Sequence, residues 1–313
     1  MTTENTVSFS IITPTFNRAW CIERVVKSVL QQKFQNWELI IVDDGSTDNT
    51  KNVVEKYLID PRVRYFYKRN GGVGSARNFG IEHAKGGLIM FIDSDDEFTE
   101  GAFDTIAYAE CHYNDFGIFI LGATNQKGKK TYFMDGDRRP ISFEEFISEK
   151  YYKGEAYMCF RRIVFSDKED RFDEEINGGE SIWIFGVLKK YKAIMFNTIV
   201  RIYYTGSADS MITSNLTISK MKNVSRIQSK LLEEFGEDFR KYNHKKLGEI
   251  YLVLARALAL TGPPILSIKY FLRGILYSPF DIKRVTLYIL SIFDRNLYVN
   301  NFLNSVYNRI THK

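Results

Sequence analysis

The sequence has few cysteines, and no two of them are spaced for metal binding. Cys21, Cys111 and Cys159 are scattered through 313 residues, and no CxxC motif occurs. An odd and scattered set of cysteines argues against a disulfide scaffold and against a zinc site. We therefore expect a protein of a reducing cytosol. With 313 residues, of which 44% are hydrophobic, the chain is long enough to bury a core.

Long apolar runs are absent as well. No stretch of about 18 apolar residues occurs, which is the length that a membrane-spanning helix needs. The best candidate, residues 250–260, is too short and contains Arg256. The first residues lack a charged segment followed by a long apolar one, so we predict no signal peptide and a cytoplasmic protein.

Two common glycine motifs for binding nucleotides are missing. No Walker A loop is present, and "GGVGSARNFG" (71–80) has Arg77 where a dinucleotide fingerprint needs its third glycine. The glycines of this segment instead allow close approach of the backbone to a neighbour. Arg77 itself can reach a phosphate or an acidic partner.

Apolar strands that alternate with amphipathic helices dominate the first third of the chain. We predict strands within residues 9–17, 37–50, 63–70 and 87–96, separated by helices, and we expect the first strand to stop at Pro14. This order predicts βαβ units in a mainly parallel sheet. Ligands bind beyond the carboxyl ends of such strands, where "PTFNR", "VDDGSTD" and "DSDD" follow three of them. We expect these three polar clusters to meet in space.

The remaining sequence predicts a less regular half and then a helical end. Residues 142–152 predict a helix, with Ser142 and Glu145 at capping-box spacing. A second helix is predicted at 178–191 and a strand from 193 onward. From about residue 216 the pattern is helical, with a break at Gly262-Pro263-Pro264. We therefore expect an α/β fold whose mixed sheet is flanked by helices, with a helical C-terminal extension.

The acidic run Asp93-Ser94-Asp95-Asp96 ends the fourth predicted strand. In an extended chain Asp93 and Asp95 point the same way. Two hard oxygen ligands on one side suit Mn²⁺ or Mg²⁺, which complete their coordination with water and phosphate. An acidic loop without metal is the alternative, whereas a calcium EF-hand lacks its Gly and Glu positions here.

Taken together, "FSIITPTFNRAWCIERVVKSVLQQKFQNWELIIVDDGSTDNT" and "NGGVGSARNFGIEHAKGGLIMFIDSDD" strongly resemble the family 2 inverting glycosyltransferases of GT-A fold. The resemblance covers about residues 7–103. It implies that residues 1–103 form the nucleotide-sugar half of a GT-A domain, 104–215 the acceptor half, and 216–313 an extension. The resemblance assigns the donor site, with Mn²⁺ or Mg²⁺, to Pro14, Thr15, Arg18, Asp43, Asp44, Arg77, Asn78, Asp93, Ser94 and Asp95.

The resemblance also implies individual roles within that set. Pro14, Thr15 and Arg18 would line the nucleotide pocket, and Arg77 and Asn78 would support the donor. Asp44 would contact the base, taken to be uracil, with Asp43 nearby. Asp93 would face the ribose or the metal, and Asp95 would bind the metal on the diphosphate. For "VDDGSTD" (42–48) the alternative is a turn that caps the following helix, with Ser46, Thr47 or Asp48 as the N-cap.

The catalytic base is less clearly marked. Inversion needs a base that deprotonates the acceptor hydroxyl, and the family typically supplies it from a Glu-Asp pair that opens a helix. Here Glu180 fits the Glu, but Ser181 replaces the Asp. Asp173, Glu174 and Glu175 are the fallback candidates. Glu180 can also be a first-turn acid that the helix dipole favours.

A second departure concerns histidine. Family members often carry one after a Tyr-rich strand, but residues 201–211 contain none. The resemblance then implies that water and phosphate complete the metal coordination.

Charge is distributed unevenly along the chain. Residues 219–313 hold 16 Lys and Arg against 7 Asp and Glu, whereas residues 1–218 hold 27 against 31. A basic region hints at an anionic partner. Its helices can lie on a membrane that carries a lipid-linked acceptor, or can simply pack on the catalytic domain with a solvated face. We expect no nucleic-acid partner, because no recognition motif accompanies the charge.

These observations predict an inverting hexosyl- or N-acetylhexosaminyltransferase. It would move a sugar from a UDP-linked donor to a hydroxyl of a glycan or lipid-linked oligosaccharide in surface polysaccharide synthesis, as a cytoplasmic protein peripheral to the inner face of the plasma membrane. A nucleotidyltransferase with the same acidic metal site is one rival, although its glycine-rich, lysine-bearing signature is missing. An inactive nucleotide- or glycan-binding protein is the other.

Overall fold

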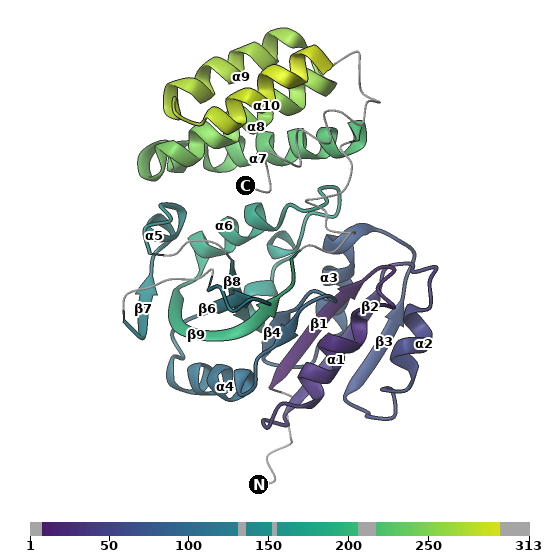
Figure 1. The fold of residues 1–313 in the computed structure, drawn as a ribbon. Coiled ribbons are helices and arrows are strands. Elements are labelled where there is room, and N and C mark those ends of the chain that lie inside the picture. Colours follow the sequence, from purple (N-terminus) through teal and green to yellow (C-terminus); the bar gives the residue numbers. More distant parts are fainter. Residues whose placement is uncertain (1–7, 131–135, 152–154, 206–216, 295–313) are drawn as a thin grey trace. The chain divides into compact units, whose positions relative to one another are not determined.

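The computed structural model describes residues 8–130, 136–151, 155–205 and 217–294 (Figure 1). The chain divides into two compact units, residues 1–205 and 206–313. The finer division into 1–103, 104–215 and 216–313 stays a prediction.

The first unit is built on one mixed sheet, as predicted. The strand order is β3-β2-β1-β4-β8-β6-β9-β5, and β7 pairs with β9. The pairs β1–β2, β2–β3, β1–β4 and β6–β9 are parallel, and the others are antiparallel. The strands are β1 Phe9–Thr15, β2 Trp37–Asp43, β3 Val63–Tyr67, β4 Leu88–Phe91, β5 Glu97–Phe98, β6 Ile118–Asn125, β7 Arg138–Ile141, β8 Ala156–Arg161 and β9 Ala193–Tyr203.

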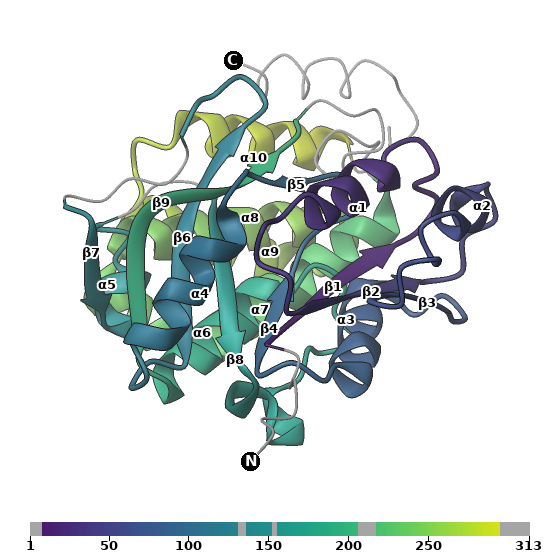
Figure 2. The ribbon, with the colours of Figure 1, turned by 90° about the horizontal axis from the view of Figure 1, so that it is seen from below.

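Helices cover both faces of this sheet. Figure 2 shows strands β1 to β3 lying between α1 and α3. Phe9 and Ile11 of β1 share a core with α1 and α4, whereas Ile12 faces Gly80 of α3. The helices are α1 Ile22–Leu30, α2 Thr50–Glu55, α3 Gly72–His83, α4 Ala102–His112, α5 Phe143–Ile147 and α6 Glu180–Lys190, with 3₁₀ turns η1 Arg162–Phe165 and η2 Lys168–Asp170.

Alternation along β1 explains why both faces can be covered. Side chains of successive strand residues point to opposite faces, so β1, which is buried at every position, is covered on both. At Gly80 the contact with β1 is so close that an added Cβ would lie 2.4 Å from Ile12 Cγ2. Glycine at this position therefore lets α3 approach the strand, which brings Arg77 of the same helix close to the end of β4.

The end of β1 differs from the prediction, which stopped the strand at Pro14. The strand runs to Thr15, and Pro14 pairs with Val42 of β2. β4 pairs only with Phe9–Ile12 of β1, so no ladder exists on the β4 side at Pro14. A proline is tolerated there because its missing N–H is not needed.

Two helix predictions need correction. The helix predicted over 142–152 covers only Phe143–Ile147 in the structure; its capping box of Ser142 and Glu145 is confirmed. Glu149 has φ of 54°, in the left-handed region, and such a backbone cannot continue a helix. The N-cap position of α2 is Asn49 rather than Ser46, Thr47 or Asp48, but its side chain makes no capping bond; Asp48 Oδ1 instead accepts from the backbone N of Thr50, the first helical residue, at 3.0 Å.

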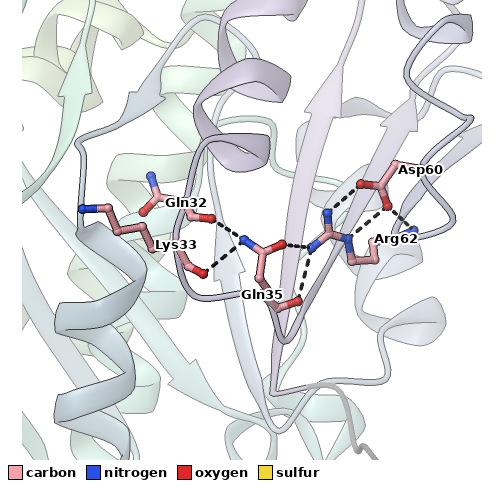
Figure 3. A network of polar contacts seen from close by, with 5 residues as sticks. All are labelled: Gln32, Lys33, Gln35, Asp60 and Arg62. Carbon is pink, nitrogen blue, oxygen red and sulfur yellow. Dashed lines mark hydrogen bonds and ion pairs between the residues drawn. The ribbon is translucent and has the colours of Figure 1, made fainter.

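A polar network ties the loop after α1 to the start of β3 (Figure 3). Gln35 Nε2 donates to the carbonyls of Gln32 and Lys33, at 2.6 and 3.1 Å. Arg62 donates to Gln35 Oε1 at 2.6 Å. Its Nε and one terminal nitrogen donate to the two carboxylate oxygens of Asp60, at 3.0 and 2.7 Å. This network fixes the end of the sheet opposite to the one that carries the acidic clusters.

The second unit is helical, as predicted for the C-terminal part. α8 contacts each of the other helices that the structure describes here. No helix among the described residues is both long and apolar enough to cross a membrane. The helices are α7 Ile218–Tyr242, α8 His244–Thr261, α9 Pro264–Tyr277 and α10 Ile282–Asp294.

Candidate active site

The loops that follow β1 and β2 are bound to each other. Asn17 has φ of 53°, and its Oδ1 accepts from Thr47 N at 2.8 Å. Its own backbone N donates to Ser46 Oγ at 2.8 Å, and Ala19 N donates to Asp48 Oδ2 at 3.0 Å. The expectation that "PTFNR" and "VDDGSTD" meet is therefore realised. Asn17 was not singled out from the sequence, although Asn is among the residues that tolerate this backbone region.

Asp44 joins the β2 loop to the glycine turn that opens α3. Its carboxylate accepts from Lys68 Nζ at 2.8 Å and from the backbone N–H groups of Gly71 and Gly72 at 2.9 and 2.7 Å. Gly72 has φ of 88°, which only glycine adopts easily. The predicted close approach of these glycines thus serves Asp44, and its contact with a base stays a prediction.

Asp43 is buried and bonded on both carboxylate oxygens. Oδ1 accepts from Ser46 N at 2.7 Å, and Oδ2 accepts from Tyr65 Oη at 2.5 Å. Burial and the Asp43 charge raise the pKa of the Tyr65 hydroxyl, so this group stays a donor. Lys68 and Tyr65 had no role in the sequence reasoning, because both lie in or beside β3 without any motif.

The residues predicted to line the nucleotide pocket lie on this same edge of the sheet. Pro14 and Thr15 are buried at the end of β1. Within the described residues, the Thr15 hydroxyl is buried without a hydrogen-bond partner. Arg18 follows in the loop, and its backbone N donates to Thr50 Oγ1 at 2.9 Å. A buried hydroxyl without a partner marks a place where a bound group or an ordered water belongs.

Arg77 brings three of the predicted residues together. One terminal nitrogen donates to Glu180 Oε1 at 2.8 Å, and the other donates to Asp93 Oδ1 at 3.1 Å. The Arg77 side chain is only 10% exposed, and its guanidinium lies 5.8 and 5.4 Å from the ring centres of Phe91 and Phe172. A buried guanidinium with two carboxylates and two rings is held in one orientation.

The aromatic packing around Trp183 explains how Glu180 reaches this point. Trp183 of α6 stacks on Phe165 and contacts Phe172, Phe160 and Phe91, with ring centres between 4.4 and 6.5 Å apart. Because Phe91 ends β4, this cluster fixes the first turn of α6 against the strand that leads into the acidic run. Glu180 is the first residue of that helix.

The acidic run after β4 is partly neutralised by arginines. Asp96 is buried and forms an ion pair with Arg201 Nε at 2.8 Å, while Arg24 donates to the Asp95 carbonyl at 2.7 Å. Burial still dominates over Arg201 and, with the charges of Asp93 and Asp95, raises the pKa of Asp96 to about 7. Burial and the Asp93 charge likewise raise the pKa of Asp95. Ser94, which lies between Asp93 and Asp95 in the sequence, is buried.

This electrostatic arrangement fits a divalent cation. Asp93 and Asp95 present hard carboxylate oxygens two positions apart, and burial together with the Asp93 charge raises the pKa of Asp95. Among residues 8–130, 136–151, 155–205 and 217–294, no cluster of three or more His, Cys, Asp or Glu side chains is arranged to hold a metal. The protein thus offers two carboxylates, and Mn²⁺ or Mg²⁺ readily completes such a shell with water and phosphate.

Asn78 of α3 bonds to the segment that precedes α6, a role that was not predicted. Its amide accepts from Phe172 N at 3.0 Å and donates to Phe172 O and Glu174 Oε1, both at 2.9 Å. These bonds attach the segment before α6 to α3. Its support of the donor stays a prediction.

A small recess opens beside Arg77 and Glu180. It measures about 220 Å³, including space open to solvent. Of the fallback bases, Asp173 lines this recess, Glu174 is bonded to Asn78, and Glu175 is exposed. The lining residues are Val73, Gly74, Arg77, Phe172, Asp173, Ile176, Gly178, Gly179 and Glu180.

A mixed, mainly parallel sheet flanked by helices, with acidic turns at its carboxyl edge, is the arrangement of the GT-A fold. The profile described as "Glycosyl transferase family 2" matches residues 10–171, which is more than half of the chain. The chain belongs to this family, and it is a glycosyltransferase.

Three known proteins illustrate the likeness. A Campylobacter jejuni enzyme, "GalNAc(5)-diNAcBac-PP-undecaprenol beta-1,3-glucosyltransferase", is 29% identical over 301 residues, which cover 92% of this chain and 94% of that protein. The structure of S. aureus TarS 1–349 with UDP-GlcNAc has a TM-score of 0.62 at 17% identity and covers 94% of this chain and 82% of that one. The Pyrobaculum calidifontis mannosyltransferase PcManGT with GDP-Man and Mn²⁺ has a TM-score of 0.57 at 16% identity and covers 94% and 88%.

Proposed function

We propose that this glycosyltransferase moves a hexosyl or N-acetylhexosaminyl group, with inversion, from a UDP-sugar to a hydroxyl of a lipid-linked glycan. The acceptor would be a growing surface polysaccharide or oligosaccharide at the inner face of the plasma membrane. In this proposal residues 1–103 bind the donor, residues 104–215 bind the acceptor, and residues 216–313 form an extension. The sugar and the linkage are left to the donor panel below.

The observation that carries the proposal is the double contact of Arg77. Glu180, the proposed base, and Asp93, proposed for the ribose or metal, lie within 2.8 and 3.1 Å of the same guanidinium. Inversion by single displacement needs the base and the leaving diphosphate on opposite sides of one anomeric carbon, a few ångströms apart. Glu180 and Asp93 come from different parts of the chain, 87 positions apart in the sequence, and both bond to the same arginine, which supports this assignment.

Each residue then has a defined task. Glu180 takes the proton from the acceptor hydroxyl as the new glycosidic bond forms and the bond to the diphosphate breaks. Arg77 keeps Glu180 in place and offers positive charge on the side of Asp93. Asp93 and Asp95 would hold Mn²⁺ or Mg²⁺, which would supply positive charge against the leaving diphosphate. Arg18, Ser94 and the edge formed by Pro14, Thr15, Asp43 and Asp44 bind the nucleotide.

The nature of the donor and acceptor is supported by the relatives. The Campylobacter jejuni protein acts, by its name, on a diphospho-undecaprenol-linked glycan and matches over nearly its full length. The similar TarS fold was solved with UDP-GlcNAc, whereas PcManGT was solved with GDP-Man and Mn²⁺. Both donor bases must therefore be tested, and a divalent metal must be varied.

The test is turnover with a panel of UDP-, GDP- and dTDP-sugars, with and without Mn²⁺, in the wild type and in Asp95→Asn. We expect nucleoside diphosphate release from a UDP-sugar that needs Mn²⁺ and that falls by at least about a hundredfold in Asp95→Asn. Asp115→Asn, which changes an exposed carboxylate on the protein surface, is the matched control and should retain full turnover.

Full turnover of Asp95→Asn with metal present would rule the mechanism out. Pyrophosphate release from a nucleoside triphosphate would favour a nucleotidyltransferase instead. Donor binding without any transfer, across a range of glycan acceptors, would favour an inactive binding protein.

A further inference from the structure

The helix α9 packs Ser267, Gly274 and the rings of Tyr270 and Phe271 against the protein and presents aliphatic side chains to solvent. Ser267 Oγ donates to the carbonyl of Ala255 in α8 at 2.8 Å. A Cβ added to Gly274 of α9 would lie 2.6 Å from Leu252 Cγ of α8, so this close contact between the two helices requires glycine. The aliphatic side chains are exposed instead: Ile265 77%, Ile268 51%, Leu272 62% and Leu276 76%.

These four exposed residues form one stripe. Their spacing of three, four and four positions places them on the same face of a helix. Beyond the end of α9 the apolar surface continues with Phe280 and Ile282, which are 89% and 75% exposed. A surface helix normally buries such a stripe, and an exposed apolar surface of this extent marks an interaction site. We call Ile265, Ile268, Leu272, Leu276 and Phe280, with Lys269 and Arg273, the α9 surface.

The charged residues of α9 itself are of one sign. Lys269 and Arg273 are exposed on α9, and Lys283 is exposed near the start of α10. No Asp or Glu occurs between Glu249 and Asp281. The stripe is therefore bordered by cations and by no anion of its own helix.

We propose that the α9 surface docks on a lipid bilayer that carries anionic head groups. Aliphatic and aromatic side chains enter the boundary of the acyl chains, and Lys269 and Arg273 pair with the head groups. Two copies of the chain joined through this stripe would bring four cations together without an anion, which opposes a dimer. The inference deepens the proposed function, on which it rests for the lipid-linked acceptor, by naming the surface that meets the membrane.

Flotation of the full-length protein with vesicles tests the proposal without any donor. We expect binding to phosphatidylcholine vesicles that contain phosphatidylglycerol, and much weaker binding to phosphatidylcholine alone. The double change Leu272→Ser with Leu276→Ser should weaken binding at least about tenfold, because two apolar side chains are then no longer transferred from water into the bilayer. Its control is Ile59→Ser, at an aliphatic residue of the first unit that is 91% exposed.

A second pair of variants tests the cations. Lys269→Glu with Arg273→Glu should weaken binding to the anionic vesicles at least about tenfold. Lys127→Glu with Lys129→Glu changes the net charge by the same amount at exposed positions of a β-turn, and should change binding little. The comparison separates a local contact from a general effect of net charge.

Three results would overturn the proposal. One is that the double leucine variant binds vesicles as tightly as the wild type. Another is that the two double charge variants lose the same amount of vesicle binding. The third is a concentration-dependent dimer in gel filtration that the leucine changes abolish, which would assign the stripe to a second copy. Nucleoside diphosphate release in solution is measured in parallel and should be unchanged in all α9 variants, so loss of docking is distinguishable from failure of the proposed transferase reaction.

Discussion

At the scale of single residues, Arg77 defines the candidate site because it cannot be replaced by another cation. Its guanidinium uses two terminal nitrogens for two carboxylates that come from different elements. A lysine would offer a point charge without this planar fork. The position of Glu180 therefore depends, besides the aromatic cluster around Trp183, on a residue 103 positions away in the sequence.

This geometry gives a prediction about which carboxylate is the base. Glu180→Gln should lower kcat by about a hundredfold or more while KM for the donor changes less, because the base is lost whereas the amide oxygen can still accept from Arg77. Glu174→Gln and Asp173→Asn should retain most of the wild-type kcat. Steady-state rates on an acceptor found with the donor panel decide between them. If Asp173→Asn lowered kcat as much as is expected for Glu180→Gln, Asp173 would become the assigned base.

The sequence allowed a good prediction of the elements in the first third of the chain. Strands β1 to β4 and helices α1 and α3 have regular apolar spacing, and this spacing is a local property. β8 and β7 were missed. β8 lies between β4 and β6, so its pairing depends on residues far away, and β7 contains Pro140 within a mostly exposed segment.

The candidate site was predictable only in part for the same reason. Strand ends on one edge of the sheet predicted that the acidic loops converge. The contacts of Asn78 with Phe172 and Glu174 join residues 94 and 96 positions apart, and no motif spacing indicates them. Family resemblance supplied Glu180 as a candidate, whereas its contact with Arg77 required the structure.

The attachment of α3 to the segment before α6 gives a prediction at the scale of elements. Asn78→Ala removes the partners of the Phe172 N–H and carbonyl in a buried place, and should lower the free energy of unfolding by about 1–3 kcal/mol. The turnover should fall as well, because this segment leads to Glu180. Urea denaturation with a matched activity assay provides both numbers.

The control for this change is Asn52→Ala. Asn52 is exposed and donates to Asn49 within the same helical turn, so its loss should change the unfolding free energy by less than about 0.5 kcal/mol. Equal destabilisation by the two alanine variants would contradict the view that Asn78 holds the two elements together.

At the scale of the whole molecule, the charge separates along the chain. The 16 cations against 7 anions of residues 219–313 contrast with the 27 against 31 of residues 1–218. A catalytic region without excess positive charge has little reason to adhere to an anionic surface by itself. The basic region can supply that attraction, while the acidic turns after β4 remain available to a metal and a diphosphate.

This asymmetry predicts that salt affects the two substrates of the enzyme differently. Incorporation of labelled sugar into a membrane glycolipid extract, presented in vesicles with phosphatidylglycerol, should fall several-fold as NaCl rises from low to high ionic strength. At 1 M salt the Debye length is about 3 Å, so attraction to the head groups is screened. Release of nucleoside diphosphate from the donor in solution should change by less than about twofold, because the donor site is partly buried. If both rates fell in parallel, salt would be acting on the active site, and the basic C-terminal region would have no separate role in reaching the acceptor.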